Sequence, residues 1–183
     1  MSNDLQSVLK ELDEEYGFAD LPDSVYHVRL GKNNKLTESN GKTPSFRVGW
    51  VVKSGEFAKR EVGDFLRWFP SDPAKAADKD QQRFVRSQVT QFIQAVASTI
   101  TDPDISAAYG EKVRTLRNSP TPEAAVAAIG DIASMASDTE LFVRLVTSKP
   151  KPPATTGYQN VRYMEKGEPI HGTSEAELTA VSI

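Results

Sequence analysis

The clearest pattern along the chain is an alternation of apolar and polar positions within residues 44–69. Every second position from Phe46 to Val52 is apolar, which is typical of a strand with one buried face. A short polar turn separates this strand from a second one, which we expect to extend from Arg60 to Phe69 with Gly63 as a bulge or bend. Trp50 shares the apolar face, so we expect it in the core. The pattern therefore predicts a hairpin around which the rest of the domain is built.

Periodicity elsewhere predicts three further strands and three helices. Alternating residues predict strands over 25–30, 141–146 and 158–164. Apolar spacings of three and four residues predict helices over 78–99, 105–117 and 122–136, the last beginning at Pro122 behind a Thr121 cap. The expected buried stripe of the longest helix consists of Phe84, Val85, Gln88, Val89, Phe92, Ile93 and Val96.

Both ends of the chain differ in character from this middle part. Residues 3–15 have the spacing of a short amphipathic helix with an acidic face, which either packs on the domain or binds a partner. Its apolar stripe is also sufficient for a small isologous contact in a homodimer. Residues 165–183 resemble a mobile tail. We therefore expect one domain over residues 21–164, with a helical insert at 71–138, between an N-terminal helical segment (1–20) and a C-terminal tail.

The order of three strands, a helical segment and two strands indicates an α+β, mainly β fold. It is the order of the five-stranded Greek-key barrel called the OB-fold, here with a helical insert between strands 3 and 4. That fold binds oligonucleotides or oligosaccharides on the face of strands 2 and 3 and with the loops joining strands 1 to 2 and 4 to 5.

The amino-acid composition indicates in which kind of cellular compartment the protein is expected. Cysteine is absent, which removes disulfides and thiolate metal sites and fits a reducing compartment. No apolar run reaches the roughly 20 residues that a membrane span needs. We expect a soluble cytoplasmic protein with no membrane partner.

Charge is distributed unevenly, although the net charge is only -3. Residues 24–70 carry nine cations and four anions, and residues 139–164 carry four cations and one anion. The anions are concentrated at the two ends and in the helical insert. The segments that we expect to form strands are therefore basic, which favours an anionic partner.

Several motifs resemble a phage family whose members are regarded as single-stranded-DNA-binding proteins. The resemblance begins in the stretch GFADLPDSVYHVRLGKNNKLTESNGKTPSFRVGWVVKSGEFAKREVGDFLRWF and covers roughly residues 17–164. The matching motifs are Pro22 with Tyr26, Gly41-Lys42, Trp50 to Arg60, Gln94-Ala95-Val96, and Tyr158 to Tyr163. The resemblance implies non-sequence-specific binding of single-stranded DNA in phage DNA replication or recombination, within the host cytoplasm and alongside other replication or recombination proteins.

A binder of single strands needs cations along the phosphates and aromatic faces for the bases. The expected nucleic-acid-binding residues are Lys32, Lys35, Lys42, Arg47, Lys53, Arg60, Phe65, Arg67, Phe69, Arg144, Lys149, Lys151, Tyr158 and Arg162. Phe65, Arg67 and Phe69 would share one strand face, leaving Leu66 and Trp68 for the core. For Phe65 and Phe69 the alternative is that they only cap the barrel.

An enzymatic function finds little support in the sequence. With two histidines and no cysteine, we expect no catalytic residues, no metal site and no cofactor. Asp78, Asp102 and Asp104 are better explained as helix caps and turn residues than as a nuclease site. The alternative function is a non-catalytic structural or host-interaction protein that uses an OB-like scaffold to bind another protein.

Overall fold

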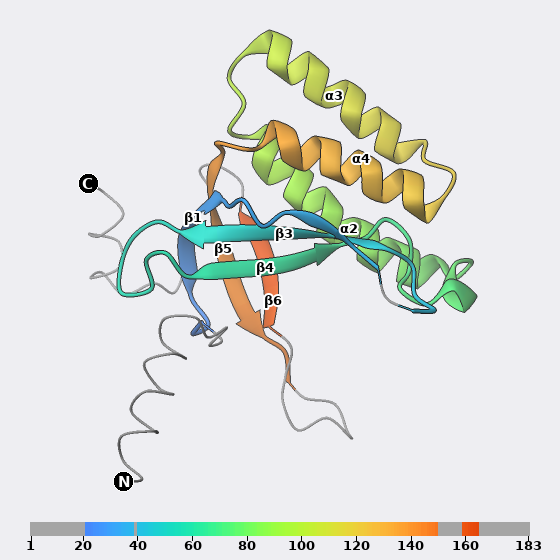
Figure 1. Ribbon diagram of the computed structural model, residues 1–183, viewed down its shortest axis with the longest axis horizontal. Coiled ribbons are helices and arrows are strands. Elements are labelled where there is room, and N and C mark those ends of the chain that lie inside the picture. Colours follow the sequence, from blue (N-terminus) through green and yellow to red (C-terminus); the bar gives the residue numbers. More distant parts are fainter. Residues whose placement is uncertain (1–20, 39, 150–158, 165–183) are drawn as a thin grey trace, which may run out of the picture.

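A computed structural model describes residues 21–38, 40–149 and 159–164 of the chain. These residues form an α+β fold, in which an antiparallel sheet of six strands packs against three α-helices (Figure 1). The strands are β1 (Val25–Leu30), β2 (Lys35–Thr37), β3 (Ser45–Val52), β4 (Glu61–Leu66), β5 (Glu140–Thr147) and β6 (Gln159–Met164). The helices are α2 (Lys79–Ala97), α3 (Pro103–Arg117) and α4 (Pro122–Met135), preceded by a 3-10 turn, η1 (Pro73–Lys75).

Strand β3 is the centre of the sheet. Along one edge it pairs with β4, and along the other it pairs first with β2 and then with β1. After the helices, β5 returns to lie beside β1 and then pairs with β6. The spatial order β5-β1-β3-β4 is that of a Greek key. In the described residues no ladder joins β4 to β6, so the observed sheet of six strands is open.

The predicted hairpin is confirmed, with two corrections. Val48 and Trp50 are fully buried, so the alternation in β3 identified the core face correctly. The ladder between β3 and β4 is continuous through the pair Gly49 and Gly63, so Gly63 makes no bulge. The second strand ends at Leu66, and not at Phe69 as expected.

An aromatic cluster joins the sheet to α2. Trp50 of β3, Phe92 of α2 and Tyr163 of β6 contact one another edge to face, with ring centroids 5.4 to 6.2 Å apart. Such pairs add roughly 0.5 to 1.5 kcal/mol each beyond the area they bury. The cluster therefore fixes α2 across the side of the sheet where β4 and β6 are not paired.

Helices α2 and α4 begin within one residue of their predicted starts, while α3 begins at Pro103, two residues before the predicted start. Asp78 and Asp102 accept hydrogen bonds from backbone N–H groups in the first turns of α2 and α3, and Thr121 does the same for α4. This confirms that Asp78 and Asp102 are caps, and Asp104 lies in the first turn of α3. The prediction that Phe84 is buried is wrong, because its side chain is 61% exposed. The fully buried positions of α2 begin only at Val89, so the first turns of the helix project from the core.

Helices α3 and α4 lie side by side (Figure 1). Helix α4 packs on β3 and β2. Strand β2 was not predicted, because residues 31–44 have the polar composition of a loop. The predicted N-terminal helix, the C-terminal tail and most of the loop over 149–157 lie outside the described residues. Within the described part of the chain, no helix is both long and apolar enough for a membrane crossing.

Candidate nucleic-acid interface

A groove with a volume of about 890 Å³ lies on the outer side of the β3–β4 hairpin. Its walls come from the loop after β1, from β2, from β3 and β4, and from the first residues of β6. We call it the β3–β4 groove. Four of the predicted binding residues line it: Lys32, Lys35, Arg47 and Phe65.

Three of these residues form a row across three strands. Lys35 of β2 lies opposite Arg47 of β3, and Arg47 lies opposite Phe65 of β4. Directly opposed residues of antiparallel strands place their side chains on the same face of the sheet. Lys35 is exposed and Phe65 is 44% exposed, so a cation and an aromatic face remain available to a ligand.

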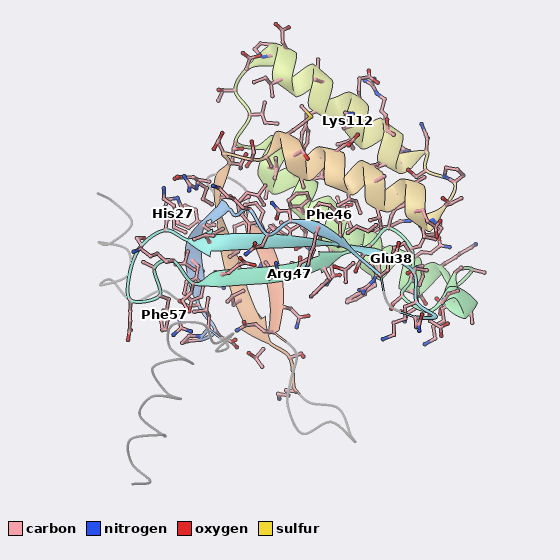
Figure 2. All side chains as sticks on the ribbon, viewed as in Figure 1. His27, Glu38, Phe46, Arg47, Phe57 and Lys112 are labelled. Carbon is pink, nitrogen blue, oxygen red and sulfur yellow. The ribbon has the colours of Figure 1, made fainter. Side chains whose placement is uncertain are left out.

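Arg47, which lies at the middle of this row and is labelled in Figure 2, has two protein partners. Its Nη2 donates to Glu61 Oε1 at 2.5 Å, and its Nη1 donates to the carbonyl oxygen of Asn33 at 2.9 Å. The two charged side chains are only 16% and 18% exposed. Breaking a partly buried ion pair leaves an uncompensated charge, so Arg47 and Glu61 stabilise each other and the loop that they hold.

The glycines of the hairpin provide room for this ion pair. A Cβ atom on Gly49 would lie 2.7 Å from Glu61 Oε1, and one on Gly63 would lie 3.2 Å from Arg47 Nη2. Any larger residue at these opposed positions would displace the ion pair. The glycine that we expected to bend the strand is therefore better explained by the close approach of Arg47.

Two asparagines fasten the loop after β1 to the hairpin. Asn33 Nδ2 donates to Glu61 Oε2 at 2.6 Å. Asn34 accepts a hydrogen bond from the N–H of Gly49 at 2.9 Å and donates to the carbonyl oxygen of Gly31 at 2.7 Å. These contacts determine where the exposed Lys32 lies. Asn33, Asn34 and Glu61 were not predicted from the sequence, although the polar pair between two lysines was a signal of a structured loop.

The segment after β4 departs from its predicted geometry. Because the strand ends at Leu66, Arg67 and Phe69 do not continue the face of Phe65. Phe69 is partly buried and packs against the core, as does Trp68. This arrangement favours the capping alternative for Phe69 over base stacking. Burial lowers the pKa of the Arg67 guanidinium, partly offset by the charge of Asp64.

The other predicted binding residues lie apart from the groove. Lys42 and Lys53 flank opposite ends of β3, and Lys53 Nζ donates to Glu140 Oε1 at 2.5 Å. Arg60 lies in the turn between β3 and β4. Arg144 and Arg162 oppose each other across β5 and β6, with Lys149 beyond the end of β5. Lys151 and Tyr158 lie outside the described residues.

A half-buried carboxyl group, that of Asp64, lies on the face of β4 that also carries Val62 and Leu66. Asp64 Oδ2 accepts a hydrogen bond from the Tyr163 hydroxyl at 3.0 Å, and Oδ1 accepts one from the N–H of Phe65 at 2.8 Å. Burial raises the pKa of Asp64 despite these hydrogen bonds. Burial and the nearby Asp64 also raise the pKa of Tyr163 well above its ordinary value.

Among the described residues that line the groove, one is acidic, Glu61, and it is paired with Arg47. In residues 21–38, 40–149 and 159–164 there is no cluster of three or more histidine, aspartate and glutamate side chains arranged to hold a metal ion. Comparison with known proteins adds no assignment, since no protein-family model matches the chain and a search of curated proteins finds no significant relative.

Proposed function

We propose that this protein is a non-enzymatic single-stranded-DNA-binding protein of the phage type, acting in DNA replication or recombination without sequence specificity. The observation that carries the proposal is the row of Lys35, Arg47 and Phe65 on the outer face of the central hairpin. Cations beside an exposed aromatic ring are what a single strand needs, because phosphates require charge and unstacked bases require a flat apolar surface.

The position of the groove supports the same function. If β1, β3, β4, β5 and β6 are taken as the five strands of an OB-fold, the groove lies on the face of strands 2 and 3 and beside the loop joining strands 1 and 2. An OB-fold is a partly open barrel, which is compatible with a sheet that is open between β4 and β6. Fold alone licenses no function, so the proposal depends on the side chains in the groove.

Binding to single strands and duplexes should be compared directly. A fluorescently labelled oligothymidylate and a labelled duplex of the same length would each be titrated with the protein, and anisotropy recorded. A label is preferable to tryptophan emission, because Trp50 is fully buried and Trp68 packs against the core. The proposal predicts clearly tighter binding of the single strand. Equal affinity for both, or no binding, would overturn it.

A second candidate function, docking of another protein, is favoured by a different surface. A groove of about 460 Å³ lies between β2 and α4 and is lined by Leu36, Phe46 and three carboxylates. Leu36 is 52% exposed, while Asp131 pairs with Lys112 across α4 and α3. Apolar side chains flanked by carboxylates would bind a peptide of a host protein that carries both apolar and basic residues. Capture of such a partner without nucleic acid, lost in Leu36→Glu, would support this function.

A further inference from the structure

Helix α2 carries a second basic surface on the side away from its buried residues. Lys79, Arg83 and Arg86 recur at spacings of four and three residues, so they lie on one face of the helix. A hollow of about 470 Å³ follows this face. The remaining side chains that line it are neutral hydrogen-bonding groups: Gln82, Ser87, Thr90, Gln91 and Gln94. We call this surface the α2 stripe.

The charge of the α2 stripe is not neutralised by carboxylates. None of its lining residues is acidic, although residues 71–138 carry nine anions and seven cations. In the described part of the chain, Lys79 and Arg83 form no ion pair. The summed charge of the insert therefore conceals a cationic face, although Asp78 and Asp80 flank Lys79 at the start of the helix.

Arg86 is held in place by uncharged partners. Its guanidinium carbon lies 5.0 Å from the centre of the Trp68 ring and 5.9 Å from that of Phe69. Its Nε also donates to the carbonyl oxygen of Trp68 at 3.3 Å. Cation–π contacts orient a guanidinium without cancelling its charge. Arg86 is thus an ordered cation that remains available to an anionic ligand.

A short segment after β4 connects the β3–β4 groove to the α2 stripe. Trp68, which contacts Arg86, follows Phe65 by three residues, and α2 packs against both β4 and β6. From Lys79 to Gln94 the helix rises by about 22 Å, at roughly 1.5 Å per residue. A strand that leaves the groove past Phe65 therefore has a cationic surface several nucleotides long within reach.

We infer that the α2 stripe binds the phosphate backbone of single-stranded nucleic acid and extends the path of a strand held in the β3–β4 groove. This inference rests on the proposed function. Unpaired cations and amide side chains bind phosphodiester oxygens without selecting bases.

Oligonucleotide length separates the stripe from the groove. Labelled oligothymidylates of about 8 and about 30 nucleotides would be titrated over a salt series, the shorter one lying within the range of a single OB-fold site. The double variant Lys79→Gln/Arg83→Gln should bind the longer strand more weakly and bind the shorter strand as the wild type does. For the longer strand, its slope of log affinity against log salt should be shallower by about 1.4, at roughly 0.7 per lost phosphate contact.

A control variant completes the test. Arg114→Gln/Arg117→Gln removes the same charge from α3 and should match the wild type on both strands. Far-UV circular dichroism would verify that each variant is folded.

The outcomes distinguish the inference from the proposed function. If Lys79→Gln/Arg83→Gln binds the longer strand as tightly as the wild type and with the same slope, the α2 stripe is not part of the path, while the groove remains a binding site. Equal losses on both lengths would contradict an extension, because they would make the stripe the primary site. If the wild type binds neither strand, the proposed function fails and the inference fails with it.

Discussion

At the scale of single residues, Arg47 shows what alternation in a sequence can predict. Arg47 lies on the polar face of β3, and the core residue Trp50 lies on the other face of the same strand. This placement was predictable from the alternation of apolar and polar residues with a period of two. The partner of Arg47, Glu61, was not predictable, because Glu61 lies opposite Val51 and reaches Arg47 along the ladder, past Gly49 and Gly63. This contact depends on the register of the two strands, which a turn of uncertain length leaves open. The strand face that carries Arg47 was therefore predicted, but its role in holding the loop after β1 was not.

Phe65 carries the aromatic part of the binding hypothesis. We predict that Phe65→Ala lowers the affinity for oligothymidylate by about 1 to 3 kcal/mol, the usual contribution of one stacked base, with little change in salt slope. Because Phe65 is 44% exposed, the variant should retain its fold. Anisotropy titration at several salt concentrations measures both quantities. Leu36→Ala, at a somewhat more exposed apolar position outside the β3–β4 groove, is the control, and an equal effect of both variants would contradict a stacking role for Phe65.

Asp64 should make stability depend on pH. Its pKa is raised by burial, so the folded protein favours the neutral carboxyl, and this contribution to stability is present in acid and lost as pH rises through the raised pKa. Asp64→Asn keeps an oxygen that can accept from Tyr163 and removes the ionisation. We predict that the variant gains stability relative to the wild type as pH rises towards neutral. Urea denaturation over a pH series measures the difference, and a constant or reversed difference would refute this explanation.

At the scale of elements, the largest errors in the predictions arise where an apolar pattern in the sequence continues beyond the end of a strand or beyond the buried part of a helix. Apolar residues persist from Phe65 to Phe69, but the strand ends at Leu66, because Trp68 and Phe69 turn to pack beside Arg86 of α2. In α2 the spacing that includes Phe84 is helical throughout, yet only the part from Val89 onwards meets the core. Helix starts were predictable, since capping depends on neighbouring residues alone.

The loop after β1 should depend on Asn34. Asn34→Ala leaves the N–H of the buried Gly49 without its acceptor, and an unsatisfied buried donor costs about 1 to 3 kcal/mol. We predict a loss of stability of that size in urea denaturation, together with weaker binding of oligothymidylate, because Lys32 is no longer positioned. Asn40→Ala, in the exposed connection between β2 and β3, should change neither quantity. Equal stability of the two variants would show that Asn34 does not hold the loop.

At the scale of the whole molecule, charge segregation was the most informative feature of the sequence. The basic character of residues 24–70 predicted a cationic hairpin, and the structure places Lys32, Lys35 and Arg47 around one groove. The net charge of the helical insert did not predict the α2 stripe. A helix places charged side chains on different faces, and a net charge does not show how they are distributed among those faces. The order of strands indicated an α+β fold and a return of β5 to β1, while the open edge between β4 and β6 depends on packing against α2.

The central claim is that the β3–β4 groove holds a single strand. The most direct measurement is the salt dependence of binding of a short oligothymidylate by the wild type, by Lys32→Gln/Lys35→Gln and by the control Arg114→Gln/Arg117→Gln. We predict that the groove variant binds more weakly and that its slope of log affinity against log salt is shallower by about 1.4, while the control retains the wild-type slope. A groove variant that matches the wild type in both affinity and slope would contradict the claim.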